Sequence, residues 1–156
     1  MSTITIRNVT EQDFALLRWL AHRCGTLDVH TPYTYWTVCQ YFHDTCFLLE
    51  ADGQPIGYIM AVRTPETVFI WQIGILEPYR GLKLSPLLIG QVAACAEKAG
   101  MSIQVSIAQE NAASYGAFTS YCAKHQLTMR PAGMVDISDL MEPDFHESEV
   151  LYQITR

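Results

Sequence analysis

The chain has 156 residues, the size of one ordinary domain, and 49% of them are apolar, which is enough to close a hydrophobic core. Sixteen acidic against ten basic residues give a net charge of −6, which disfavours a nucleic-acid partner and favours a small cationic one. No apolar run reaches the about 20 residues that cross a bilayer, and no signal peptide is recognisable, so we expect a cytoplasmic protein without a membrane partner.

The five cysteines are odd in number, widely spaced and free of any CxxC pair, which argues against a disulfide framework and a structural zinc site. Cys39, His43 and Cys46 have the one spacing that suggests a metal, but a fourth ligand at short range is missing. We therefore expect these thiols to be packed in the core.

The N-terminal third predicts a strand and two helices. Residues 3–8 alternate like a strand, and Thr10 followed by acidic residues has the pattern of a helix N-cap. Thr31 followed by Pro32 predicts the start of a second helix, because proline suits the first helical position.

A meander of three strands is expected next. Residues 45–51 and 55–62 are rich in β-branched and aromatic residues and are joined at Asp52-Gly53, a hairpin signal. Residues 67–76 are almost continuously apolar, as in a strand buried on both faces.

The second half begins with a turn at residues 80–85, followed by a helix to Lys98 that Gly100 ends. The remaining expected elements are a strand, a helix and two strands, at residues 101–108, 111–124, 127–137 and 149–155. This order predicts one domain over residues 1–156, of the α/β class with a mixed sheet.

The turn between the buried strand and the next helix can hold a pyrophosphate. Backbone N–H groups and the positive helix end converge there on an anion. Arg80 adds a cation, and Gly81 lets the backbone approach a ligand closely. The alternative is an ordinary surface turn that carries one arginine.

The strand order, the strand at residues 69–76, the Arg80-Gly81 turn and the Asn111-x-x-Ser114-x-x-x-Phe118 helix together resemble the GNAT acetyltransferase superfamily. The resemblance implies acetyl-coenzyme A as cosubstrate and an α/β fold with four helices, whose mixed sheet splays between strands four and five. It also implies cofactor contacts at Ile73, Gly74, Ile75, Arg80, Gly81, Leu82, Lys83, Leu84, Ser85, Asn111 and Ser114.

The chain departs from that family's pattern R-x-x-G-x-G/A at Lys83 and Ser85. Lys83 could crowd the pyrophosphate, or donate its backbone N–H and direct its ammonium at a phosphate. We hypothesise the second. Phe118 occupies a position where many members carry a tyrosine as general acid.

Four segments, at residues 27–35, 39–45, 69–72 and 144–152, resemble the diaminobutyrate acetyltransferases of ectoine biosynthesis. The resemblance implies a homodimer that acetylates N4 of L-2,4-diaminobutyrate, a small cationic amino acid. It places Asp28, Tyr33, Trp71, Gln104, His146 and Glu149 around that substrate.

Three positions depart from this narrower pattern. Gln104 stands where a glutamate is usual, and His30 and Pro32 also differ. Because glutamine offers only a neutral hydrogen bond to an ammonium, the exact amine stays open.

Acetyl transfer needs a neutral amine, a site for the oxyanion and a proton acceptor. We expect Glu149, assisted by His146, to accept the ammonium proton, and a backbone N–H near Ile73 to bind the oxyanion. Structural alternatives are a turn cap for Asp28, a core position for Trp71, a surface position for His146 and an edge-strand charge for Glu149.

Two other functions remain open. One is a GNAT acetyltransferase for another small amine or a peptide N-terminus. The other is a module that binds acyl-coenzyme A without turnover, since a fold does not fix a function.

Overall fold

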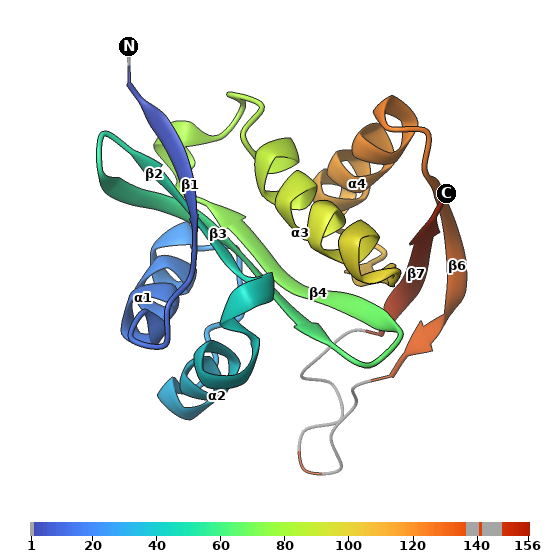
Figure 1. The fold of residues 1–156 in the computed structure, drawn as a ribbon, viewed down its shortest axis with the longest axis horizontal. Helices are drawn as coiled ribbons and strands as arrows, with labels where there is room; N and C mark the ends of the chain where they lie inside the picture. Colours follow the sequence, from blue (N-terminus) through green and yellow to red (C-terminus); the bar gives the residue numbers. More distant parts are fainter. Residues whose placement is uncertain (1, 137–140, 142–147) are drawn as a thin grey trace. The chain divides into compact units, whose positions relative to one another are not determined.

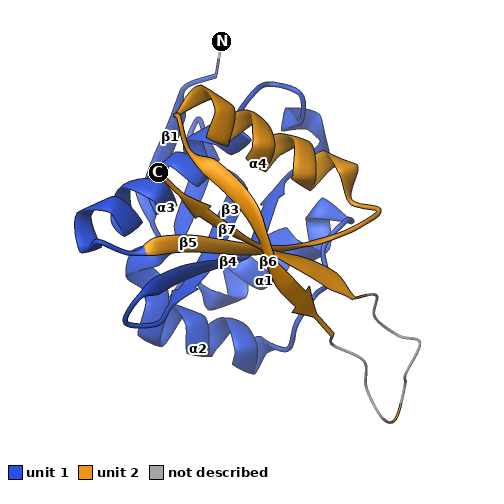
Figure 2. Ribbon diagram, turned by 90° about the vertical axis from the view of Figure 1, so that its right-hand side faces the viewer, with its two compact units in different colours: residues 1–101 blue, residues 102–156 orange. Residues whose placement is uncertain are grey.

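The computed structural model describes residues 2–136, 141 and 148–156. These residues form two compact units, residues 1–101 and residues 102–156, coloured separately in Figure 2. None of the described helices has both the length and the apolar character that crossing a membrane requires.

The first unit is built on an antiparallel sheet in the order β1-β2-β3-β4. Its strands are β1 (Ile4–Asn8), β2 (Phe47–Ala51), β3 (Gln54–Arg63) and β4 (Thr67–Ile75). Asp52 and Gly53 connect β2 to β3 with φ values of 50° and 79°. Two successive positive φ values are typical of the primed hairpin turns, which confirms the predicted hairpin.

Helices cover both faces of this sheet. They are α1 (Phe14–Cys24), α2 (Pro32–Phe42) and α3 (Ser85–Ala99), with short 3-10 turns η1 (His43–Thr45) and η2 (Glu77–Tyr79). Figure 1 shows α1 and α2 on one face and α3 on the other. Because both faces are covered, β3 is buried from Ile56 to Ala61.

The core on the α1 and α2 face joins helix and strand side chains. Leu17 and Leu20 of α1 and Val38 of α2 are buried in the same cluster as Tyr58 and Met60 of β3. Each such buried apolar side chain contributes about 1.5–3 kcal/mol to folding.

The first helix begins later than expected. Thr10 does not cap it, because the Asp13 carboxylate accepts the Thr10 backbone N–H at 2.8 Å and pairs with Arg7 at 2.9 Å. Burial acts to raise the pKa of Asp13, but the hydrogen bonds from Arg7 and Thr10 outweigh it and the pKa is lowered. The segment from Thr10 to Asp13 thus closes a turn, and α1 starts at Phe14.

The second unit has an antiparallel sheet in the order β5-β7-β6. Its elements are β5 (Ser102–Ala108), α4 (Ala112–Lys124), β6 (Thr128–Val135) and β7 (Glu149–Thr155). Alternate residues of β5, namely Ile103, Val105 and Ile107, are buried, as are Phe118 and Tyr121 of α4. These side chains give the unit its apolar core.

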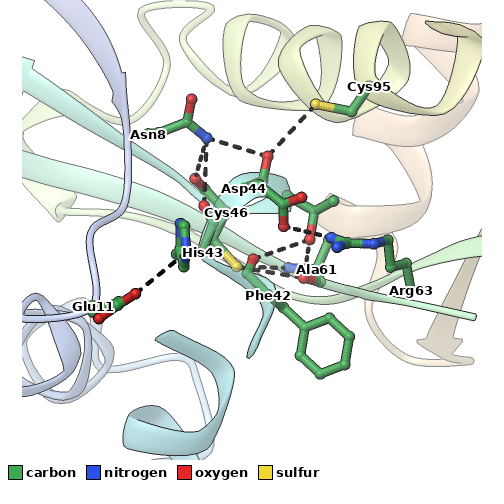
Figure 3. Close-up of polar contacts among 10 residues, drawn as sticks. Asn8, Glu11, Phe42, His43, Asp44, Cys46, Ala61, Arg63 and Cys95 are labelled. Atoms are coloured by element: carbon green, nitrogen blue, oxygen red, sulfur yellow. Dashed lines mark hydrogen bonds and ion pairs between the residues drawn. The ribbon is translucent and has the colours of Figure 1, made fainter. Parts of the chain in front are cut away.

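Cys39 and Cys46 are buried, and burial raises the pKa of each thiol to about 12. The Cys46 thiol donates to the Ala61 carbonyl at 3.4 Å. His43 instead pairs with Glu11, with Nε2 and Oε1 3.9 Å apart, and Figure 3 shows its ring directed toward that carboxylate. The predicted packing of these two cysteines is therefore confirmed.

Candidate active site

The turn between β4 and α3 presents unpaired backbone donors. Within the described part of the chain, no hydrogen bond is found for the N–H groups of residues 83–85. Gly81 and Lys83 both have left-handed backbones, with φ of 79° and 58°, directly before the N-terminus of α3. Left-handed residues at a helix start aim successive N–H groups at one point, which suits a phosphate oxygen.

Lys83 adopts the backbone shape that the family pattern assigns to glycine. An L-residue in this region costs about 1–2 kcal/mol, whereas glycine adopts it without this penalty. The Lys83 side chain is exposed and the turn retains its left-handed geometry. The departure therefore adds a cation without removing the backbone donor.

The Arg80 guanidinium makes hydrogen bonds within the chain that the sequence did not indicate. Its Nε donates to the Ile75 carbonyl at 2.9 Å, and a terminal nitrogen donates to the Cys24 carbonyl. Arg80 thus ties the end of β4 to the end of α1. Its predicted contact with a cofactor stays a prediction.

Ile73, Gly74 and Ile75 lie opposite Ile59, Tyr58 and Gly57 in the β3–β4 ladder. A Cβ atom on Gly74 would stand 2.6 Å from Leu27 Cδ1 and 3.0 Å from Cys24 Sγ. Glycine is therefore needed here for the close packing of the α1–α2 loop on β4.

Three predicted substrate residues come from neighbouring parts of the first unit. Asp28 is exposed in the loop between α1 and α2, and Tyr33 lies in the first turn of α2 with 75% of its surface exposed. Trp71 is 40% exposed, and its ring lies 5.3 Å from the His30 ring. The structure thus brings the loop that carries Asp28 against Trp71.

Trp71 is a β-bulge residue. Met60 lies opposite Gln72, whereas Ala61 lies opposite Ile70, so Trp71 has no partner of its own in β3. Burial in β4 nevertheless alternates regularly: Val68, Ile70, Gln72 and Gly74 are buried, and Trp71 lies on the less buried side of the strand, where it is the most exposed residue.

A buried polar network next to Trp71 was not predicted. Gln72 is only 6% exposed, and its Oε1 accepts hydroxyl hydrogen bonds from Tyr35 at 3.0 Å and Tyr58 at 2.6 Å. Its Nε2 donates to the Asp28 carbonyl at 2.7 Å. The signal in the sequence was a single amide inside the apolar run at residues 67–76.

The second unit holds Gln104 and Glu149. Gln104 Nε2 donates to Gln153 Oε1 at 3.4 Å, and these two residues lie opposite each other in the β5–β7 ladder. Glu149, half-buried at the start of β7, lies on the same face but four residues away, which is about 13 Å along a strand.

Asn111 and Ser114 form the N-terminal cap of α4. The Asn111 side-chain oxygen accepts the Ser114 backbone N–H at 3.1 Å. Phe118 is buried in the core of the second unit. His146 lies outside the described residues.

The acetyltransferase (GNAT) family model matches residues 14–123, which is most of the chain. The chain belongs to this family. It is accordingly an enzyme of the acetyltransferase class, and the predicted α/β GNAT fold with four helices is confirmed. The predicted splay of strands four and five stays a prediction.

Two curated relatives align with more than nine tenths of the GNAT chain. It is 33% identical to L-2,4-diaminobutyric acid acetyltransferase of Streptomyces avermitilis over 149 residues, which is 91% of this chain and 82% of that protein. It is 28% identical to the enzyme of the same name from Halalkalibacterium halodurans, over 98% of this chain and 82% of that protein.

Two solved structures are similar to almost the whole chain. The diaminobutyrate acetyltransferase EctA from Paenibacillus lautus, in complex with L-2,4-diaminobutyric acid and coenzyme A, is 26% identical with a TM-score of 0.84, covering 99% of this chain and 96% of that one. Ard1 from Thermoplasma volcanium, at 12% identity and a TM-score of 0.79 over 98% of both chains, shares the fold.

Proposed function

We propose that this GNAT enzyme transfers the acetyl group of acetyl-coenzyme A to a primary amine of L-2,4-diaminobutyrate, giving N4-acetyl-L-2,4-diaminobutyrate for ectoine biosynthesis. The observation that carries the proposal is the similarity, over 99% of the chain, to a diaminobutyrate acetyltransferase that binds this amino acid and coenzyme A. The L-2,4-diaminobutyric acid acetyltransferase relatives, which align with 91% and 98% of this chain, support it.

The proposed cofactor site is the turn at residues 80–85. Its unpaired backbone N–H groups and the N-terminus of α3 suit the diphosphate, and the exposed Lys83 ammonium adds charge. Ile73, Gly74 and Ile75 are proposed to contact the pantetheine arm. Asn111 and Ser114 are proposed contacts on α4.

The proposed amine site uses Asp28, Tyr33 and Trp71. A carboxylate fixes an ammonium, a phenol donates to the substrate carboxylate, and an indole face covers an alkyl chain or a cation. Gln104 is proposed as a neutral hydrogen-bond partner. The net charge of −6 attracts a cationic amino acid at long range.

In the proposed mechanism, Glu149 takes the ammonium proton directly or through water, assisted by His146. The neutral nitrogen attacks the thioester carbonyl, and a backbone N–H near Ile73 stabilises the oxyanion. As the amide forms, the attacking nitrogen loses a second proton to water, and because Phe118 has no hydroxyl, the coenzyme A thiolate leaves as such or takes a proton from water.

Thiol release from acetyl-coenzyme A tests the proposal against a panel of amines: 2,4-diaminobutyrate, ornithine, lysine, diaminopropionate and a peptide N-terminus. We expect the highest kcat/KM for diaminobutyrate. A higher kcat/KM for another amine would identify that amine as the substrate in place of diaminobutyrate. The comparison matters because Gln104 offers an ammonium only a neutral hydrogen bond. Cofactor binding without thiol release on any amine would identify a binding module instead.

We also propose a cytoplasmic homodimer that folds as one GNAT domain over residues 1–156. The family model supports the single domain, because residues 14–123 include parts of both compact units. Light scattering on the purified protein tests the dimer, which has twice the 17.6 kDa of one chain.

A further inference from the structure

Gln72 is an amide in a place that disfavours amides. It is 6% exposed, on a strand whose neighbouring residues are apolar. Burial of an amide is unfavourable unless its hydrogen bonds are satisfied. Here both ends are satisfied, and no buried side-chain nitrogen or oxygen of the described residues lacks a partner.

The orientation of this amide follows from its partners. The Asp28 backbone carbonyl can only accept, so the Gln72 Nε2 must face it and Oε1 must face the tyrosines. Burial raises the pKa of both Tyr35 and Tyr58, so the two hydroxyls stay protonated and donate to Oε1.

The same network reaches the loop a second time. The His30 backbone N–H donates to the Tyr35 hydroxyl oxygen at 3.4 Å, while that hydroxyl donates to Gln72. Gln72 therefore fixes Asp28 directly and His30 through Tyr35.

Two packing contacts extend this attachment along β4. Leu27 occupies the space left by the missing Cβ of Gly74, and the His30 ring lies against Trp71. Loop residues 27, 28 and 30 thus meet strand residues 74, 72 and 71 in order. The loop has no regular secondary structure of its own, so such contacts set its position.

We propose that Gln72 is a positioning residue for amine recognition: its amide holds the Asp28–His30 loop against β4, and so places Asp28 beside Trp71. This inference rests on the proposed function, in which Asp28 and Trp71 contact the amino-acid substrate. The alternative hypothesis is that the Gln72 amide only stabilises the core and has no effect on amine binding.

The principal variant is Gln72→Met, which keeps the volume and removes all three hydrogen bonds. We expect the KM for the amine to rise about tenfold or more, the effect of one or two lost hydrogen bonds, while the KM for acetyl-coenzyme A stays within about twofold. The matched control is Leu49→Ala, a cavity in a buried position of β2 outside the core cluster that contains Tyr35 and Tyr58, which should lower the Tm and leave both KM values unchanged.

Gln72→Glu adds a test by pH. A buried carboxyl group has a raised pKa, and only its neutral form can donate to the Asp28 carbonyl. The kcat/KM for the amine, relative to the unaltered enzyme, should fall as the pH rises through that pKa. A core-only role predicts no such change in the ratio.

Hydrogen exchange of the His30 amide measures the loop without turnover. In Gln72→Met we expect this amide to exchange about tenfold faster, with no change in Leu49→Ala. If diaminobutyrate is not turned over by the unaltered enzyme, the proposed substrate fails, but the KM is then taken for the amine that is acetylated and the exchange test still applies. Unchanged exchange together with parallel effects on both KM values would overturn the positioning role.

Discussion

At the candidate site, some side-chain roles follow from the local sequence and others depend on distant parts of the chain. Lys83 and Gly81 were placed in an anion-binding turn, and the structure gives that turn left-handed backbones and unpaired N–H groups. The contacts of Arg80 and Gln72 were not predicted. Apart from the Ile75 carbonyl, five residues before Arg80, their partners lie 56, 44, 37 and 14 residues away in the sequence, so no local pattern encodes these contacts.

Glu149, half-buried at the start of β7, is the base of the proposed mechanism. Glu149→Gln keeps the shape and removes the proton acceptor, so we expect kcat to fall by about 10²–10⁴-fold, with a smaller rise in the amine KM. Steady-state kinetics with diaminobutyrate measure both. An unchanged kcat would remove Glu149 from this role.

Lys83 combines an unfavourable backbone with a proposed phosphate contact. Lys83→Gly removes the cost of φ 58°, so we expect an unfolding free energy higher by up to about 1 kcal/mol, together with weaker acetyl-coenzyme A binding. Denaturant unfolding and calorimetric binding over a salt titration measure the two effects.

Lys83→Asn is the matched control, because asparagine tolerates the left-handed region but has no charge. It should weaken cofactor binding and its salt dependence as Lys83→Gly does. If both variants bind as tightly as the unaltered enzyme at every salt concentration, the ammonium has no phosphate role.

The helices and strands were predicted more completely than the contacts between them. The β-strands at residues 149–155 and 67–75 and the helix starting at Pro32 follow the periodic and capping signals closely. The predicted start of the first helix was wrong, because the Asp13 carboxylate binds Thr10 and Arg7 and the helix begins only after it. The competing partner, Arg7, comes from the preceding strand, which a helix-cap signal does not consider.

Glycine positions in two elements give an opposed pair of stability predictions. Gly74→Ala in β4 pushes against Leu27 and Cys24, and we expect a loss of about 1–2 kcal/mol. Gly116→Ala in α4 meets nothing within 4 Å, and we expect a gain of about 0.5–1 kcal/mol from helix propensity. Chemical denaturation of both variants checks the signs.

A double variant identifies the cause of the Gly74→Ala loss. Leu27→Ala removes the side chain that stands 2.6 Å from the added methyl group, so its combination with Gly74→Ala should cost less than the sum of the two single changes. Simple additivity would show that the strand itself, rather than the docked loop, resists the methyl group.

For the whole molecule, the fold class and the family could be predicted because the order of the strands and the residues of the turn match the family pattern along most of the chain. The family match at residues 14–123 confirms this prediction. The substrate half of the site was harder to predict. The proposed site includes an irregular loop that contacts Gln72 and Gly74 of β4, and the sequence of the loop does not reveal these contacts.

Binding of the cosubstrate should be visible in global stability. If acetyl-coenzyme A binds only the folded chain, a concentration of one hundred times its Kd raises the unfolding free energy by about 2.7 kcal/mol. For a protein of this size the Tm should then rise by about 5–10 °C. Thermal scans with added sodium chloride at the same ionic strength are the control, and an unchanged Tm would contradict the proposed cofactor.

The burial of the cysteines has a practical consequence for the bench. Cys24, Cys39, Cys46 and Cys122 are shielded and Cys95 is partly exposed. A chromogenic disulfide reagent that reports free coenzyme A would therefore meet a background of at most about one protein sulfhydryl per chain as long as the fold stays closed. The colour developed in a continuous assay therefore measures the coenzyme A that is released. A sudden increase of several sulfhydryls per chain would indicate denaturation rather than catalysis.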